Sequence, residues 1–521
     1  MRRWPFHPLL FAMFPVLFLF ARNVAITEPR KVILPFLVVV ACAVVVTTVA
    51  AVALRDARKG AIAGAGLMLL ALSYGHVWTT IQGKTVGGVV VGRDMVLIPL
   101  WIIGGVAVVV FASRVRSLPE ITGILNAAAL ALVALAVFNI ASGLAGRSGE
   151  PVESRPGERS EPIPVASGKT TRDIYYLIFD RYAGPSELEE HFDFDNEPFL
   201  DELRDRGFYV ADRSVANYPD TTHSMASSLN IEYLDALADK VGSLSTDLRP
   251  LHQRIVNPKI ARFLKRQGYR YAHAGPWFDP TAHDPTAHVN YHYDKRSEFT
   301  QVLLDTTVLQ AVGKHVDFLE DLDGRHVPHN QILFQFDAIR SASQLEGPTF
   351  TLAHFLLPHE PYTFDAQGNF VTREQELEKS FEEAYVGQVE FANAQIRKLV
   401  DDLIDVGERE RPIIVIQADE GPKRLEWTYG GEKAWTEATD SQLRLKSSIL
   451  NAYYLPGIDD PGLYRSITPV NSFRKIFNLY FDTKLALLPD RSYAFGTSKQ
   501  PYVLTDISSR LGTLDPTRRT P

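Results

Sequence analysis

The sequence predicts an α-helical membrane domain of about five spans, followed by an α/β domain with a mostly parallel central sheet. Three observations lead to this fold class. Apolar residues crowd the first 145 of the 521 positions, and nearly all of the 14 histidines come later. A stretch rich in Pro, Gly, Ser and charge follows the apolar part. Beyond it, aliphatic runs of strand length alternate with helical patterns, which is typical of a parallel sheet covered on both faces.

The membrane part contains five apolar runs, each long enough for the roughly 20 helical residues that cross a bilayer. They are residues 8–25, 32–54, 61–81, 95–113 and 121–144. Arg2 and Arg3 precede the first run, but no small-residue cleavage site follows it, so we expect a retained anchor rather than a signal peptide.

Basic residues indicate the orientation of these spans. Arg55, Arg58 and Lys59 lie between the second and third runs, on the same side as the N-terminus, and this favours a cytoplasmic N-terminus. Five spans then predict a multi-pass protein of the plasma (inner) membrane whose C-terminal domain is extracytoplasmic. If one run instead lies along the interface, the C-terminal domain is cytoplasmic.

The expected domains are therefore a membrane domain at 1–145, a linker at 146–170 and an α/β domain at 171–521. The linker composition cannot bury an apolar face. The chain has 54 basic and 61 acidic residues, so its overall charge gives no reason to expect a nucleic acid as a partner. The single cysteine, Cys42, lies in an apolar run, so no disulfide forms within the chain.

Strands and helices of the α/β domain follow from apolar patterns. Strands are expected at 174–179, 208–210, 269–273, 349–357, 413–417 and 449–455. Helices are expected at 197–206, 258–267 and 375–406.

Acidic side chains follow two of these strands directly. Asp180 comes after IYYLIF, and Asp419 and Glu420 come after IIVIQA. Ligands of parallel sheets bind at the carboxyl ends of the strands. A lone carboxylate there is usually a helix cap, but two such ends favour a site for a divalent cation.

A hydroxyl-rich segment, NYPDTTHSMASSLN at 217–230, predicts a short helix that begins near Thr221. A threonine at a helix start is most often a cap, but beside a metal it is a candidate nucleophile. Further along, His354 closes a strand pattern and His359 lies in a Pro-bracketed loop beyond it. A loop histidine near a metal can donate a proton or bind phosphate, whereas a histidine within an apolar run is more often structural.

Taken in order, these motifs resemble the sulfatase-like branch of the alkaline phosphatase superfamily. The plan of membrane spans, linker and external domain is similar to that of lipoteichoic acid synthases and lipid A phosphoethanolamine transferases. The resemblance implies that Asp180 and Asp419 bind a metal and that Thr221 is both nucleophile and metal ligand. It also implies that His359 contacts the substrate or leaving group.

The sequence departs from the family pattern at three places, and these departures change the reaction and the metal that the resemblance implies. The Cys/Ser-x-Pro-x-Arg signature of formylglycine sulfatases is missing, and His223 occupies the usual proline position. Glu420 stands where the family has a metal-binding histidine. One divalent ion is then held by the all-oxygen set Asp180, Thr221, Asp419 and Glu420, which favours Mn²⁺, Mg²⁺ or Ca²⁺ over Zn²⁺. We expect Ser224, His223 and His354 to contact the substrate.

The expected function is a metal-dependent extracytoplasmic transferase. It would move a phosphoglycerol- or phosphoethanolamine-like headgroup from a phospholipid of the bilayer, through a phospho-threonine, to an envelope glycan or lipid. Two alternatives remain open. A phosphodiesterase or sulfatase-like hydrolase would use water as the acceptor. A catalytically inactive membrane-anchored binding module would account for Glu420 as a lost metal ligand.

Overall fold

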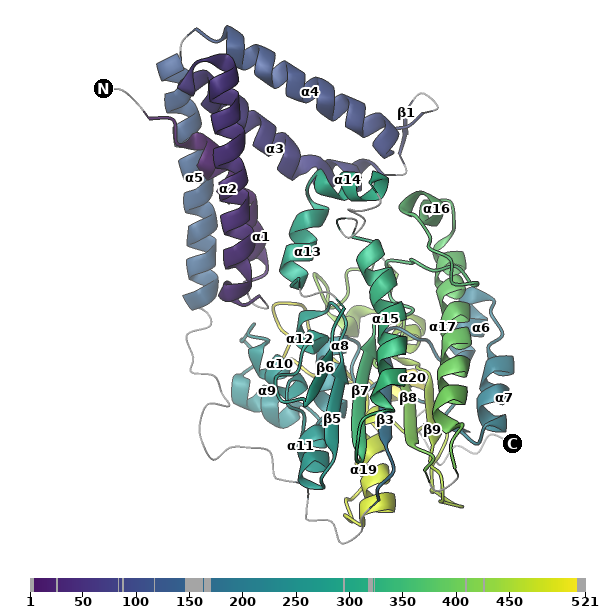
Figure 1. The fold of residues 1–521 in the computed structure, drawn as a ribbon. Helices are drawn as coiled ribbons and strands as arrows, with labels where there is room; N and C mark the ends of the chain where they lie inside the picture. Colours follow the sequence, from purple (N-terminus) through teal and green to yellow (C-terminus); the bar gives the residue numbers. More distant parts are fainter. Residues whose placement is uncertain are drawn as a thin grey trace. The chain divides into compact units, whose positions relative to one another are not determined.

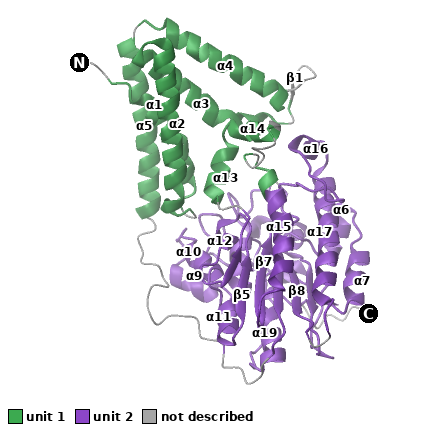
Figure 2. Cartoon of the chain, viewed as in Figure 1, with its two compact units in different colours: residues 1–149, 296–327 green, residues 150–295, 328–521 purple. Residues whose placement is uncertain are grey.

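The computed structural model describes residues 4–24, 27–82, 84–86, 89–116, 118–145, 163, 170–293, 296–316, 322, 324–407, 410–424 and 427–512. Within it the chain forms two compact units (Figure 2). Unit 1 comprises Met1–Gly149 and Arg296–Val327, and unit 2 comprises Glu150–Lys295 and Pro328–Pro521. The expected linker at 146–170 lies outside the described residues except for positions 163 and 170.

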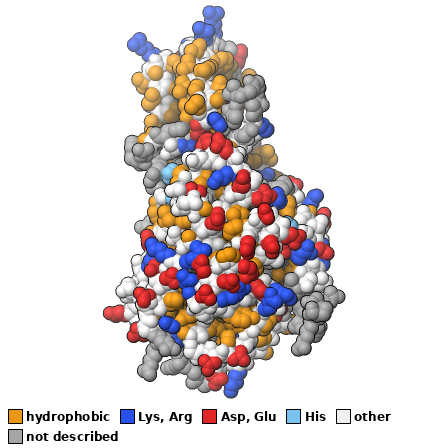
Figure 3. Space-filling view, turned by 90° about the vertical axis from the view of Figure 1, so that its right-hand side faces the viewer, with side chains coloured by type: hydrophobic (Ala, Val, Ile, Leu, Met, Phe, Trp, Pro, Cys, Tyr) orange, Lys and Arg blue, Asp and Glu red, His pale blue; other side chains and the backbone are white. Residues whose placement is uncertain are grey.

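Unit 1 contains five apolar N-terminal helices. They are α1 (His7–Arg22), α2 (Pro29–Leu54), α3 (Ala57–Ile81), α4 (Asp94–Arg114) and α5 (Leu118–Ala145), with a short hairpin of β1 (Thr85–Val86) and β2 (Val89–Val90) between α3 and α4. Among the described residues, α2 to α5 are long and apolar enough to cross a membrane, whereas α1 has only 16 residues. Apolar side chains cover the surface of these helices (Figure 3).

The expected five spans thus correspond to four helices of spanning length and one shorter helix. Helix α1 packs against α2, α3 and α5. Near its start, the Nδ1 of buried His7 lies 3.0 Å from the Oδ1 of Asn126 in α5. Burial of α1 among the other helices explains why a 16-residue helix belongs to this bundle.

A segment from the middle of the chain also belongs to unit 1. Residues 296–316, which we call the strap, contain α13 (Glu298–Asp305) and α14 (Leu309–His315). Phe299 and Leu303 of the strap are buried in an apolar cluster with residues of α1, α2 and α3. The sequence boundary at 171 assigned these residues to the α/β domain, because their helical pattern does not reveal which partner buries them.

Backbone contacts join the strap to α3. The amide of Val308 donates to the carbonyl of Ala71 (2.8 Å), and the amide of Gly75 donates to the carbonyl of Thr306 (2.9 Å). In a regular helix the amide of residue 75 donates to the carbonyl of residue 71, and here the strap bonds to both of these groups. A Cβ on Gly75 would lie 1.9 Å from the carbonyl oxygen of Asp305, so only glycine permits this approach.

Unit 2 is built on a seven-stranded sheet in the order β4-β9-β8-β3-β7-β5-β6 (Figure 1). The strands are β3 (Ile174–Phe179), β4 (Tyr209–Val210), β5 (Arg270–Ala274), β6 (Val289–Tyr291), β7 (Thr349–Phe355), β8 (Ile413–Ala418) and β9 (Asn451–Tyr454). Strands β8, β3, β7, β5 and β6 run parallel to one another, and β9 runs antiparallel to both of its neighbours, β4 and β8. The prediction of a mostly parallel sheet is confirmed.

Helices cover both faces of this sheet. The cluster on one face includes side chains of α6 (Pro185–Phe192), α7 (Glu197–Asp205), α15 (His326–Ala342) and α17 (Phe381–Ile404). The cluster on the other face includes side chains of α8 (Thr221–Ser228), α9 (Asp235–Val241), α10 (Arg249–Ile255), α11 (Lys259–Arg266) and α19 (Pro469–Phe481). The remaining described elements are α12 (Asp279–Ala282), α16 (Arg373–Leu377), a 3-10 turn (Trp435–Glu437), α18 (Asp440–Ser447), β10 (Tyr493–Ala494), β11 (Thr505–Asp506) and α20 (Ser508–Leu511).

Two details of the sheet domain differ from the sequence expectation. The predicted helix at 375–406 is divided, and α17 begins after Ser380, which forms a capping box with Glu383. The edge strand β6 was not predicted, because it has only three half-buried residues and therefore no apolar run.

Candidate active site

The register of three neighbouring strands places acidic and imidazole side chains on one face of the sheet. Phe179 of β3 pairs with Ala418 of β8, so Asp180 and Asp419 come level at the carboxyl ends of these strands. Ile178 pairs with His354 of β7, two residues before Asp180 and hence on the same face. This is the face covered by α8, since Ile178 belongs to the apolar cluster that includes α8.

These three side chains form a buried group with free ligand atoms. One ligand atom each of Asp180, His354 and Asp419 lies within 4.8 Å of the others. Asp180 Oδ1, His354 Nε2 and Asp419 Oδ2 are buried and lack a hydrogen-bond partner. Buried polar atoms without partners are costly in a folded protein, and a metal ion bound between them removes that cost. The residues present therefore fit a divalent cation.

Burial and mutual repulsion dominate the electrostatics of the group. Burial first, and then the charges of Asp419 and Glu420, raise the pKa of Asp180 well above its usual range. Burial and the charge of Glu420 raise the pKa of Asp419 to about 7. Burial lowers the pKa of His354 to about 3, so its imidazole is neutral and able to bind a metal.

His354 differs from its expected role as a substrate contact. Its Nδ1 lies 2.8 Å from the hydroxyl of Thr281, while its Nε2 lies 4.0 Å from Asp180 Oδ2. A partner on one ring nitrogen that orients the other toward a cation is the usual arrangement of metal-binding histidines. The structure thus groups His354 with the metal-ligand candidates.

Thr221 is the first residue of α8, whose N-cap is Asp220. The Thr221 side chain lies close enough to the Asp419 carboxylate to lower its pKa. Thr221 is partly exposed, and it stands at the positive end of the α8 dipole, where anionic groups are favoured. The structure therefore brings Thr221 together with Asp419, as the sequence predicts.

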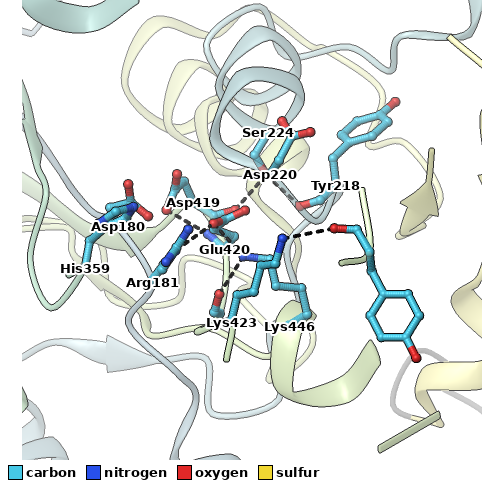
Figure 4. A network of polar contacts seen from close by, with 12 residues as sticks. Asp180, Arg181, Tyr218, Asp220, Ser224, His359, Asp419, Glu420, Lys423 and Lys446 are labelled. Atoms are coloured by element: carbon cyan, nitrogen blue, oxygen red, sulfur yellow. Dashed lines mark hydrogen bonds and ion pairs between the residues drawn. The ribbon is translucent and has the colours of Figure 1, made fainter. Parts of the chain in front are cut away.

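Glu420 lies among cations instead of completing an all-oxygen metal site (Figure 4). Its Oε1 is 2.5 Å from the buried Nζ of Lys446 and 3.3 Å from Nε of Arg181. Glu420 is not part of the group of three described above. Because Lys446 and Arg181 neutralise Glu420 and His354 supplies a nitrogen, the expected preference for Mn²⁺, Mg²⁺ or Ca²⁺ over Zn²⁺ no longer follows from the donor set.

A tight turn after Asp419 holds this ion pair in place. The amide of Gly421 donates to the carbonyl of Lys446 (2.8 Å), and Lys446 Nζ donates back to the carbonyl of Gly421 (2.9 Å). A Cβ on Gly421 would lie 2.0 Å from the carbonyl oxygen of Leu445. The glycine is therefore required for the close approach of the two backbone segments.

His359 follows β7 in the loop beyond His354, and the charges of Arg181 and Glu360 act on it. Its Nδ1 contacts the backbone carbonyl of Glu360, and because a carbonyl only accepts, Nδ1 carries the proton. Burial and the nearby Arg181 lower the pKa of His359 to about 4. At neutral pH its Nε2 is consequently an unprotonated acceptor.

The expected substrate contacts His223 and Ser224 are buried and serve the local fold. His223 binds Asp220 through Nδ1 and lies 2.8 Å from the carbonyl of Pro501 through Nε2. The hydroxyl of Ser224 donates to the carbonyl of Asp419 (2.6 Å). Both ring nitrogens of His223 and the hydroxyl proton of Ser224 are thus engaged within the protein, and their assignment to substrate binding stays a prediction.

Sequence reasoning missed three charged residues of the site, which are Arg181, Glu360 and Lys446. Arg181 contacts both Glu360 and Glu420, and Lys446 is buried beside Glu420. The adjacency of Arg181 to Asp180 was a signal in the sequence. Lys446 offered none, because its helix α18 is brought to the site only by the tertiary fold.

Asp180, His354, Asp419 and Thr221 thus form a candidate active site at the carboxyl ends of parallel strands. The family model "Sulfatase" matches residues 190–464. The chain therefore belongs to the sulfatase family of the alkaline phosphatase superfamily and carries N-terminal membrane helices, which confirms the resemblance drawn from the motifs.

Two solved structures are among those similar to this chain. The C-terminal periplasmic domain of EcEptC from Escherichia coli, in complex with Zn, is 12% identical with a TM-score of 0.45, covering 69% of this chain and 99% of that chain. The integral membrane protein lipooligosaccharide phosphoethanolamine transferase A from Neisseria meningitidis is 11% identical with a TM-score of 0.40, covering 91% of this chain and 95% of that chain. Among curated protein sequences, none matches this chain.

Proposed function

We propose that the chain is a metal-dependent extracytoplasmic transferase that moves a phospho-headgroup from a membrane phospholipid to an envelope glycan or lipid. The observation that carries the proposal is the position of Thr221 next to Asp419, which shares a buried group of unpartnered ligand atoms with Asp180 and His354. A hydroxyl at this position has both a proton acceptor and a place for an anionic group next to it.

Asp180, His354 and Asp419 would hold one divalent ion, with Thr221 next to Asp419. A mixed nitrogen and oxygen donor set suits Zn²⁺ or Mn²⁺. When bound, the ion would neutralise charge on the transferred phosphoryl group and favour ionisation of a nearby hydroxyl.

The residues of the chain suit two successive displacements at phosphorus. In the first, Thr221 Oγ forms a bond to phosphorus, its proton passes toward Asp419, and the bond from phosphorus to the glycerol oxygen breaks. Diacylglycerol leaves after taking a proton from solvent. In the second, an acceptor hydroxyl attacks phosphorus and His359 Nε2 takes the proton of that hydroxyl. The bond from phosphorus to Thr221 Oγ1 breaks, Thr221 recovers its proton from Asp419, and His359 releases its proton to solvent. Arg181 and Lys446 keep positive charge beside the site.

The membrane unit supports a lipid donor and an extracytoplasmic site. Tethering an enzyme to the bilayer raises the effective concentration of lipid substrates. The strap contacts the end of α3 near Gly75 and the start of α4 at Asp94. The strap therefore contacts α3 towards its C-terminal end. Arg55 and Arg58, the basic residues that favour a cytoplasmic position, lie at the opposite, N-terminal end of α3.

The experiment compares Thr221→Ala with the matched variant Thr222→Ala in the full chain, reconstituted in vesicles with a fluorescent phospholipid. We expect Thr221→Ala to release no diacylglycerol while melting as the wild type does, and Thr222→Ala to remain active. Mass spectrometry should find the headgroup on Thr221 in the wild type. A folded and active Thr221→Ala protein would contradict the proposal, and release of free headgroup with no acceptor product would identify a hydrolase.

The metal is tested by thermal melts of the full chain with Zn²⁺, Mn²⁺, Mg²⁺ and Ca²⁺. An ion at 100 times its dissociation constant adds about 2.7 kcal/mol to the free energy of unfolding. Asp419→Asn should abolish the part of the shift that belongs to this site. No shift with any ion would favour the binding-module alternative.

A further inference from the structure

Helix α6 carries a second group of metal-ligating side chains, apart from the active site. Glu187, Glu190 and His191 occupy positions i, i+3 and i+4, which lie on one face of a helix. One ligand atom of each lies within 4.8 Å of the others. The reaction proposed above uses none of them.

The separations within this group are those of a coordination sphere. His191 Nε2 lies 3.3 Å from Glu187 Oε2 and 3.9 Å from Glu190 Oε1. Ligands about 2.0–2.1 Å from a tetrahedral Zn²⁺ are roughly 3.4 Å from one another. The two distances to His191 Nε2 are therefore close to those between ligands of one ion.

The burial of Glu187 is an independent indication of a ligand. Glu187 is only 4% exposed, and its Oε2 has no hydrogen-bond partner. Burial, and then the charge of Glu190, raise the pKa of Glu187 to about 7. A buried carboxylate without a donor is costly, and a bound cation offsets that cost.

Two arginines lie near the group. Arg444 lowers the pKa of Glu187 in part, and burial together with Arg424 and Arg444 lowers the pKa of His191, which favours the neutral imidazole that binds metals. Acidic and basic side chains are mixed over the side of the molecule that faces the viewer in Figure 3. A cavity of about 550 Å³, lined by Glu187 and Arg444 among others, gives an ion access to the buried carboxylate.

We propose that Glu187, Glu190 and His191 form a second divalent-cation site, of the Zn²⁺ or Mn²⁺ type, that is structural rather than catalytic. The hydroxyl of Ser441 in α18 lies 3.4 Å from His191 Nε2, so the site stands where α6 meets α18. Helix α18 also carries Lys446 of the active site. A cation here stabilises the contact between the two helices.

The test counts ions bound to the purified full chain after equilibration with Zn²⁺ or Mn²⁺ alone, by elemental mass spectrometry. We expect two ions per chain in the wild type and one in His191→Ala and in Glu190→Gln. The exposed Glu189 lies on the same helix outside the group, so Glu189→Gln is the matched control and should retain two.

Further variants separate this site from the active site. Asp419→Asn should lose one ion and keep the one on α6, so failure of either site is seen independently. Glu190 is largely exposed, so Glu190→Gln is expected to fold, and its ion count is interpretable even if His191→Ala misfolds. A wild type that binds no ion, or an ion count unchanged by Glu190→Gln and His191→Ala, overturns the proposal. A single ion that these two variants lose and Asp419→Asn keeps would overturn only the metal of the active site.

Discussion

The strap is attached to the membrane helices by a buried ion pair whose loss should have a large, local effect. Lys314 Nζ lies 3.1 Å from Asp94 Oδ2 and 4.1 Å from the centroid of the Trp78 ring. Asp94 also accepts a hydrogen bond of 2.6 Å from the hydroxyl of Tyr74. We predict that Lys314→Met opens the strap from α3 while the apolar helices stay folded.

The magnitude follows from the burial of both charges. Asp94 is 4% exposed, and at 3.1 Å an effective dielectric constant of 20 gives an attraction of about 5 kcal/mol. Desolvation offsets much of this when the pair forms, but removing one partner leaves a buried charge and costs about 3–5 kcal/mol. At the lower end, the opening equilibrium of the strap rises roughly 150-fold.

Amide hydrogen exchange of the purified full chain measures this opening directly. The amides of Val308 and Gly75 bond across the contact, and both should exchange roughly 150-fold faster in Lys314→Met. Lys84→Met, at an exposed position of unit 1, is the control and should change neither. The double variant Asp94→Asn/Lys314→Met should recover part of the protection, since no unpaired charge remains.

Unchanged exchange at Val308 and Gly75 in Lys314→Met would refute the reasoning. It would mean that the apolar contacts of Phe299 and Leu303 hold the strap without the ion pair.

Three further predictions concern unit 2. Leu352→Ala empties a fully packed position in β7 and should lower the free energy of unfolding by about 2–5 kcal/mol, measured by denaturant titration. Gly421→Ala brings a Cβ to 2.0 Å from the Leu445 carbonyl and should abolish lipid turnover, because the turn after Asp419 must move. Lys446→Met leaves Glu420 with only one of its two cations and should destabilise unit 2 by about 3–5 kcal/mol in the same titration.

Each of these has a clear contrary result. Leu352→Val is the milder control, and a Leu352→Ala protein as stable as the wild type would mean that the cluster repacks around the gap. Full turnover by Gly421→Ala would mean that the turn has no part in holding Asp419. If Lys446→Met were as stable as the exposed-site variant Lys499→Met, the buried pair would contribute nothing net to folding.

The sequence predicted the parts of the active site that local patterns encode. IYYLIF and IIVIQA are short, mainly apolar runs typical of a strand buried on both faces, and this pattern placed Asp180 and Asp419 at strand ends. Thr221 follows a capping residue, and this local signal placed it at a helix start.

Strand register and long-range packing decided the rest. Whether His354 or Glu420 joins the two aspartates depends on the pairing of Ile178 with His354 and on the arrival of Lys446 from α18. Neither is a property of nearby residues.

The strap and the group on α6 illustrate the same division. The helical pattern near Phe299 is visible in the sequence, but its burial against α1, α2 and α3 depends on contacts more than 200 residues away along the chain. The spacing of Glu187, Glu190 and His191 is likewise encoded locally, whereas the burial of Glu187 exists only in the folded domain. Sequence patterns report which face of an element is apolar, and only the tertiary structure decides what covers that face and which charges meet there.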